Sequence, residues 1–193
     1  MKKAVIFDFF GVISTEVAPF WFEERFSPDK AAELKEKYMG PSDRGEASED
    51  ETFAALSALS GERAEDIRED FNRRVKINPE MVELIESLHE KYKTVLLSNA
   101  MEEWLEKILA KNDLFRLFDT TVISAKEKIA KPSAEIFRLA LSRAGISADE
   151  AVFIDDNRKN TDGAMAAGID GIVFTGVTVL KDELAAHGIS VKK

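Results

Sequence analysis

The chain has 193 residues, of which 45% are hydrophobic and 33% charged, so it can build one domain with room for a small insertion. Its formal net charge of -9 would repel a polyanion, and we therefore expect no nucleic-acid partner. The sequence contains no cysteine, which excludes disulfides and thiol chemistry. An acidic protein that binds a phosphate group needs a local cation at the binding site.

The first residues, MKKAVIF, place two lysines before an apolar run, as a signal peptide does. Asp8 ends this run far too early for the hydrophobic part of such a peptide. No stretch of the sequence approaches the length of a membrane span. We therefore expect a cytoplasmic protein without a membrane partner, present as a monomer or a homodimer.

Five short apolar runs, bounded by turn-forming residues, are typical of buried parallel strands. They cover Ala4–Phe9, Thr94–Ser98, Thr120–Ile123, Ala151–Asp155 and Gly171–Phe174. Between the later runs, apolar residues recur at the spacing of amphipathic helices. The helical segments read PEMVELIESLHEKY, EEWLEKILAKNDLF, PSAEIFRLALSRAG and NTDGAMAAG. Strands that alternate with helices predict an α/β fold with a doubly wound, Rossmann-like parallel sheet.

The segment from residue 15 to residue 78 breaks this alternation, because it carries helical patterns and no convincing strand. The patterns read SPDKAAELKEKYM, SEDETFAALSALSG and ERAEDIREDFNRRV, and Ser48 with Glu51 predicts a capping box. Such a segment is too small to hold much core of its own, so it should pack as a lid over the strand ends. We expect a core domain of residues 1–14 and 79–193 and an inserted all-helical cap of residues 15–78.

Four aromatic residues gather at the start of this insertion, in the sequence APFWFEERF. They either form a substrate-facing wall under the cap or pack the cap together. Aromatic residues at this spacing more often belong to a core, so we favour the packing interpretation. The four residues are Phe20, Trp21, Phe22 and Phe26.

Polar residues follow the predicted strands at the points where the strands end. In open α/β sheets, ligands bind beyond the carboxyl ends of the strands. Each residue alone is explained more simply as a helix cap, a surface lysine or an acidic loop. Together, three carboxylates, a hydroxyl and a lysine at one sheet edge favour a divalent cation, and such oxygen ligands suit Mg²⁺. The residues are Asp8, Ser98, Asn99, Lys131, Asp155 and Asp156.

Four stretches in this order, VIFDFFGVIS, VLLSN, AKP and FIDDNRKN, resemble the four motifs of the haloacid dehalogenase (HAD) superfamily, most of whose members are phosphatases. The resemblance covers residues 1–14 and about 79–175, and the helical insertion stands where the first type of cap of that family belongs. It implies a Mg²⁺-dependent hydrolase of small phosphomonoesters.

The resemblance also implies a nucleophile and a metal site. Asp8 would attack phosphorus and form an aspartyl-phosphate intermediate, which splits hydrolysis into two displacements. Mg²⁺ would bind to Asp8, to the backbone carbonyl of Phe10 and to Asp156. Asp155 would lie beside the metal and orient Lys131 or a metal-bound water.

The phosphate would be held by the residues of the two middle motifs. Ser98 would donate a hydrogen bond to a phosphate oxygen, with Asn99 helping through its backbone or its amide. Lys131 would bridge the phosphate and the carboxylates and prevent their repulsion in the free enzyme. Asn160, one turn after FIDDN, would support the metal ligands.

Phe10 departs from the phosphatase pattern, in which the residue two positions after the nucleophile is usually an aspartate that protonates the leaving oxygen. Phenylalanine carries no such proton, and general acid–base catalysis contributes about 10²–10⁴-fold. The substrate could have a good leaving group, as in an acyl phosphate or an anomeric sugar phosphate. Glu16, or Arg44 and Glu46 of DRGEAS, could substitute, although DRGEAS is more simply a solvated turn. The enzyme could also be slow, or only bind its ligand.

Two other functions stay open from the sequence. A metal-independent 2-haloacid dehalogenase attacks carbon with the same aspartate and tolerates an aromatic residue, usually tyrosine, at the position of Phe10. In a metal-free site, the negative charges of Asp155 and Asp156 would lie close together without a cation to neutralise them, so we favour a phosphatase. A non-catalytic protein that binds a phosphate ligand is the third candidate. The retained Asp8 and Lys131 argue against it, since a binder has no need of a nucleophile.

Overall fold

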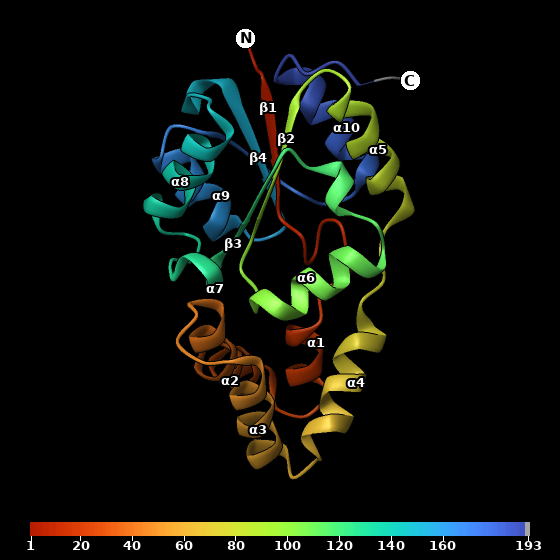
Figure 1. Cartoon of the computed structure of the whole chain (residues 1–193), viewed down its shortest axis with the longest axis vertical. Coiled ribbons are helices and arrows are strands. Elements are labelled where there is room, and N and C mark those ends of the chain that lie inside the picture. Colours follow the sequence, from red (N-terminus) through yellow and green to blue (C-terminus); the bar gives the residue numbers. More distant parts are fainter. Residues whose placement is uncertain (192–193) are drawn as a thin grey trace.

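A parallel sheet of five strands is the centre of the computed structural model, which describes residues 1–191 (Figure 1). The strands are β1 (Ala4–Phe7), β2 (Lys93–Ser98), β3 (Thr120–Ile123), β4 (Ala151–Asp155) and β5 (Asp170–Val173). They follow one another across the sheet in the order β3-β2-β1-β4-β5, so β1 is the central strand. Phe7 pairs with Leu96 of β2 and with Ile154 of β4, which brings the carboxyl ends of these three strands together.

Helices cover both faces of the sheet, because successive strand side chains point to opposite faces. Val5 and Phe7 join one hydrophobic cluster, and Ile6 joins the other. The first face is covered by α5 (Pro79–His89), α6 (Glu102–Lys111) and α10 (Val177–Ala186), and the second by α8 (Ala134–Ala144) and α9 (Arg158–Ala166). Short connections are formed by α7 (Ser124–Glu127) and by the 3-10 helices η1 (Phe115–Leu117) and η2 (Ala148–Glu150). The predicted doubly wound sheet is confirmed.

The observed strands differ from the predicted ones at four ends. β1 stops at Phe7 rather than at Phe9, because the chain turns at once: the carbonyl of Phe9 accepts hydrogen bonds from the N–H groups of Ile13 and Ser14. β2 begins one residue earlier than predicted, at Lys93, and β5 is shifted by one residue, to Asp170–Val173. The helix α10 opens with Val-Thr-Val, a run of β-branched residues that does not favour a helix. Burial of its leucines on the sheet overrides that local preference.

The helical insertion, residues 15–78, lies beyond the carboxyl end of the sheet (Figure 1). Its helices are α1 (Ala18–Glu23), α2 (Pro28–Asp43), α3 (Glu49–Ser60) and α4 (Ala64–Arg74). The predicted capping box of Ser48 and Glu51 starts α3, and Gly61 ends it in a left-handed conformation. Ser14 and Ile77 form an isolated antiparallel bridge, so the two connections to the core run side by side.

Aromatic packing holds the helical insertion together and joins it to the core. Trp21 and Phe22 are fully buried, and the ring of Trp21 lies 6.0 Å from that of Phe71 on α4. Phe71 lies in turn 5.8 Å from Trp104 on α6 of the core. The packing interpretation is therefore confirmed for Trp21 and Phe22, whereas Phe20 is exposed.

The apolar run at the N-terminus is the central strand itself. All four residues of β1 are buried between the two helical layers. Within residues 1–191, no helix combines the length and the apolar character that crossing a bilayer requires.

Candidate active site

Asp8 follows directly on the central strand and is only 7% exposed. Its N–H donates to the carbonyl of Ile154 at 2.9 Å, which continues the β1–β4 ladder, and its Oδ1 accepts from the N–H of Phe9 at 2.7 Å. The turn that follows needs Gly11, whose φ is 82°. A Cβ at Gly11 would lie 2.3 Å from Oδ2 of Asp156, so glycine also makes room for that carboxylate.

Lys131 bridges two of the carboxylates. Its Nζ lies 2.8 Å from Oδ1 of Asp8 and 2.7 Å from Oδ2 of Asp155. Burial alone lowers the pKa of Lys131, but the two carboxylates raise it above its ordinary value, so the ammonium stays charged. Burial has the opposite effect on an acid: it raises the pKa of Asp8, and the neighbouring ammonium opposes that rise.

Asn99 holds the main chain of Lys131 in place. Its Nδ2 donates to the carbonyl of Lys131 at 3.0 Å, and its Oδ1 accepts from the N–H of Lys131 at 2.9 Å. The Lys131–Pro132 peptide bond is cis. Both ends of the Asn99 amide are therefore engaged by the lysine loop, so the predicted contact of Asn99 with a phosphate is left to its backbone.

The two aspartates that follow β4 have different surroundings. Asp155 is fully buried, and its oxygens accept hydrogen bonds from the N–H of Asn157 at 2.8 Å and from Nδ2 of Asn160 at 3.1 and 3.0 Å. Asp156 is half-buried and lines the pocket described below, and burial raises its pKa to about 6. One carboxylate oxygen from each of Asp8, Asp155 and Asp156 lies within 4.8 Å of the others. These three oxygens fit a hard divalent cation such as Mg²⁺.

Ser98 ends β2 beneath the site. It is fully buried, and its Oγ has no hydrogen-bond partner within residues 1–191. A buried polar atom left unpaired costs about 1–3 kcal/mol, so such atoms are uncommon. Asn99 and Ala100 line the pocket, whereas Ser98, the residue before them, does not. The role of Ser98 toward a phosphate oxygen stays a prediction, which the unpaired hydroxyl supports.

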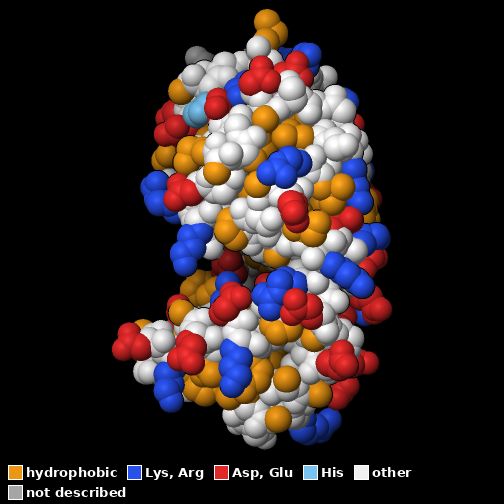
Figure 2. Space-filling model, turned by 90° about the vertical axis from the view of Figure 1, so that its left-hand side faces the viewer, with side chains coloured by type: hydrophobic (Ala, Val, Ile, Leu, Met, Phe, Trp, Pro, Cys, Tyr) orange, Lys and Arg blue, Asp and Glu red, His pale blue; other side chains and the backbone are white. Residues whose placement is uncertain are grey.

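A pocket of about 460 Å³ lies between the sheet edge and the helical insertion, and it has the size of a small-molecule site. Figure 2 shows the surface hollowed between these two parts, with acidic and basic side chains at the rim. The core contributes Asp8, Phe10, Asn99, Lys131 and Asp156 to its wall, and the insertion contributes Glu16, Lys35, Glu36, Met39 and Asp43. Sequence reasoning missed Lys35 and Asp43. Their signal was the four-residue spacing of Lys35, Met39 and Asp43, which places them on one face of α2.

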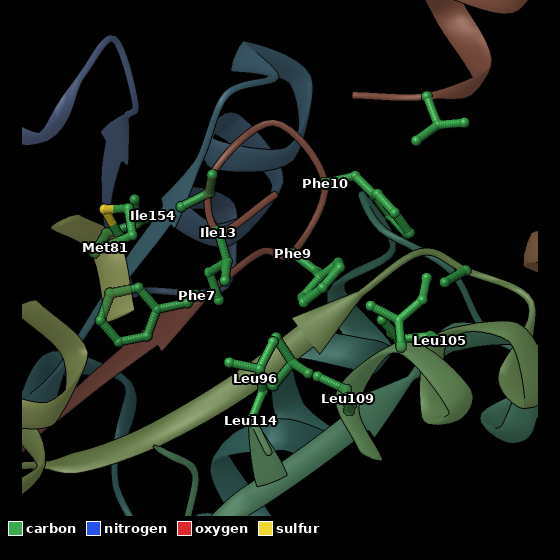
Figure 3. Close-up of a cluster of buried hydrophobic side chains, with 14 of the residues drawn as sticks. Phe7, Phe9, Phe10, Ile13, Met81, Leu96, Leu105, Leu109, Leu114 and Ile154 are labelled. Carbon is green, nitrogen blue, oxygen red and sulfur yellow. The ribbon is translucent and has the colours of Figure 1, made fainter. Parts of the chain in front are cut away.

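Phe10 brings an apolar ring into this pocket. The ring stacks on Trp104 with centroids 5.0 Å apart and lies edge-on to Phe9 at 4.9 Å. Figure 3 shows Phe9 and Phe10 on the turn after β1, with Phe9 directed toward Leu105 of α6. Packing therefore fixes Phe10, and its side chain offers no proton to the site.

Of the three residues predicted as possible substitutes for an acid at position 10, only Glu16 lines the pocket. Glu16 lines the pocket, and burial raises its pKa. Arg44 and Glu46 pair with each other, with Nε 3.0 Å from Oε1, and neither lines the pocket. Arg44 and Glu46 therefore fit the solvated-turn interpretation, whereas Asp43, the first residue of DRGEAS, lines the pocket.

Three comparisons with known proteins agree with this architecture. The family model of haloacid dehalogenase-like hydrolases matches residues 2–168. The chain is 31% identical over 125 residues to a phosphoserine phosphatase of Thermus thermophilus and 30% identical over 95 residues to (S)-2-haloacid dehalogenase 4A of Burkholderia cepacia. These matches cover 61% and 49% of this chain but 50% and 41% of those proteins, so the chain spans half of their length or less.

Among solved structures, the chain is similar to a HAD family enzyme of Bacteroides thetaiotaomicron in complex with magnesium and inorganic phosphate. The two are 26% identical with a TM-score of 0.74, and the match covers 89% of this chain and 93% of the other. The family model spans the first four strands, the helical insertion and all four motifs of the site. This chain belongs to the haloacid dehalogenase-like hydrolases.

Proposed function

We propose that the chain hydrolyses small phosphomonoesters in a Mg²⁺-dependent reaction that passes through a phosphorylated Asp8. The observation that carries this proposal is the joint placement of Asp8, Lys131 and Asp156 around one pocket. Lys131 and the N–H of Phe9 both bind Oδ1 of Asp8, which fixes the orientation of the carboxylate for an in-line attack on phosphorus.

The acidic cluster supports a bound Mg²⁺, with Asp8, the carbonyl of Phe10 and Asp156 as its protein ligands. Bound there, the cation neutralises charge on the transferring phosphoryl group and on the carboxylates. Asp155 is a positioning residue, since Lys131, Asn157 and Asn160 already occupy its oxygens. The Bacteroides thetaiotaomicron enzyme binds the same pair of ligands, magnesium and phosphate.

The phosphate itself lies against Lys131, the backbone of Asn99 and the hydroxyl of Ser98 in this proposal. Lys131 has two roles, because it also keeps Asp8 and Asp155 from repelling each other when the pocket is empty of substrate. The helical insertion acts as a cap over the core of residues 1–14 and 79–193, and its closure excludes water from the reacting atoms.

A metal-independent 2-haloacid dehalogenase is the second candidate, favoured by the aromatic Phe10 and by the likeness to the Burkholderia cepacia enzyme. The charge balance argues against it. Asp8, Asp155 and Asp156 share the one ammonium of Lys131, so without a cation the cluster holds more carboxyl groups than this ammonium can neutralise.

Phosphate release from a panel of aryl, acyl and sugar-1-phosphates tests the proposal. We expect release with Mg²⁺, none with EDTA, and none from Asp8→Asn under either condition. Asp113→Asn, a change at an exposed aspartate on the loop after α6, is the matched control and should leave release unchanged. If wild type and Asp8→Asn are equally silent across the panel, the phosphatase proposal fails. Chloride release from 2-chloropropionate without metal would then support the dehalogenase.

A further inference from the structure

One face of helix α2 turns charged side chains into the pocket that contains Asp8. Lys35, Met39 and Asp43 follow one another at four-residue spacing, and all three line the pocket. Asp8 lies at the sheet edge, at the opposite wall. In an in-line displacement, the attacking and leaving oxygens lie on opposite sides of phosphorus. The leaving oxygen therefore faces the wall that α2 provides.

Asp43 occupies an unfavourable place for a carboxylate. It is the last residue of α2, where the unpaired backbone carbonyls carry partial negative charge. Burial raises its pKa to about 7. Lys35 on the same helix and Lys131 from the core oppose that rise, while Glu36 and Glu16 add to it. An aspartic acid in such surroundings is able to carry its proton near neutral pH.

We infer that Asp43 performs the acid–base work for which Phe10 has no group: it protonates the leaving oxygen and later accepts a proton from the attacking water. This inference rests on the proposed phosphatase function. It assigns the helical insertion a chemical role in addition to covering the site.

Both steps balance. In the first, a carboxylate oxygen of Asp8 forms a bond to phosphorus, the bond from phosphorus to the ester oxygen breaks, and the proton of Asp43 moves to that oxygen to give the alcohol. In the second, water attacks phosphorus, the bond from phosphorus to Asp8 breaks, and one water proton returns to Asp43. The products are inorganic phosphate, the Asp8 carboxylate and protonated Asp43.

Glu16 is the competing carboxylate, and its position suits the task less well. It lies close enough to Asp156 for its charge to raise the pKa of that carboxyl. A carboxylate beside the metal ligands is held in its ionised form by the cation. Asp43 lies on α2, the wall that faces the leaving group.

The test compares Asp43→Asn with wild type on p-nitrophenyl phosphate and on glycerol 2-phosphate, with Mg²⁺ present. Only the alkyl ester needs a proton on its leaving oxygen, so we expect kcat/KM to fall about 10²-fold for glycerol 2-phosphate and about 3-fold or less for p-nitrophenyl phosphate. Wild-type kcat/KM on glycerol 2-phosphate should fall as the pH rises through about 7, and Asp43→Asn should lack that limb. Glu46→Gln, a change at an exposed acid just after α2, is the matched control and should behave as wild type.

Several results overturn the inference. One is an equal loss on both esters while p-nitrophenyl phosphate is still hydrolysed. Another is a leaving-group-dependent loss in Glu16→Gln that Asp43→Asn does not show. A third is hydrolysis of only the aryl ester by the wild type, which would show that no residue replaces the acid. If wild type releases no phosphate from either ester, the proposed function fails, and this inference fails with it.

Discussion

The Nζ of Lys131 lies 2.8 Å from Oδ1 of Asp8, although the two residues come from distant parts of the chain. The lysine side chain is 1% exposed, so water does not screen this pair. The ammonium opposes the rise that burial causes in the pKa of Asp8. Together with the N–H of Phe9, it orients the Asp8 carboxylate before any ligand arrives.

Removal of the lysine should therefore affect both folding and activity. In Lys131→Met, the buried carboxylates of Asp8 and Asp155 lose their common partner, and breaking a buried pair in this way costs about 3–5 kcal/mol. We expect the free energy of unfolding in urea to drop by that order at pH 7. Phosphate release should be lost even from p-nitrophenyl phosphate. Lys126→Met, which removes an exposed lysine paired with Glu102, is the control and should change stability by less than about 1 kcal/mol.

The space left by Gly11 should be required for metal binding. Gly11→Ala places a Cβ 2.3 Å from Oδ2 of Asp156 and also strains the backbone at φ 82°. Gly61→Ala is a matched control, because its φ is 79° and nothing lies within 4 Å of the added Cβ. Both variants should lose about 1 kcal/mol of stability from backbone strain. In isothermal titration with Mg²⁺, only Gly11→Ala should bind more weakly, and equal binding by the two variants would contradict a site at Asp156.

An acid introduced at the position of Phe10 should favour poor leaving groups. Phe10→Asp supplies a proton donor two residues after Asp8, so turnover should rise more for glycerol 2-phosphate than for p-nitrophenyl phosphate. The loss of stacking on Trp104 should lower stability by about 2–4 kcal/mol. Phe10→Leu is the control, since it removes the same stacking and adds no acid. Equal gains on both esters would show that an acid at this position does not protonate the leaving oxygen.

The stability of the protein should depend on pH through Asp43. Its pKa rises from 3.8 in the unfolded chain to about 7 in the fold, so the unfavourable charge is absent below about pH 4 and fully present above about pH 7. Stability from this group is thus lost as the pH rises across that window. We expect Asp43→Asn to match wild type in urea unfolding near pH 4 and to exceed it by about 1–2 kcal/mol at pH 8. An excess that does not change between these two pH values would show that Asp43 ionises normally in the fold.

The helical insertion is joined to the core through Trp104. Its Nε1 donates to Oδ1 of Asn72 on α4 at 2.9 Å, and its ring lies between Phe10 and Phe71. Asn72→Ala leaves the indole N–H unpaired and should lower stability by about 1–3 kcal/mol. If the insertion closes over substrate, KM for p-nitrophenyl phosphate should rise as well. Asn112→Ala is the control, because that side chain bonds only within its own helix end.

Much of this protein follows from patterns that are local in the sequence. The strands are continuous apolar runs, and polar residues end them, so Asp8, Ser98, Asp155 and Asp156 could be placed at one sheet edge before any coordinates were known. The capping box that starts α3 is equally local, because its two members are three residues apart.

The wall of the pocket depends instead on how α2 packs over the sheet. A helix carries polar residues on every face that is not buried. The spacing of Lys35 and Asp43 therefore does not show whether these side chains face solvent or the pocket. The same limit applied to Arg44 and Glu46, which lie next along the chain and face solvent. Tertiary contacts decide these cases, because whether a charged side chain faces water or the pocket depends on residues far away in the sequence.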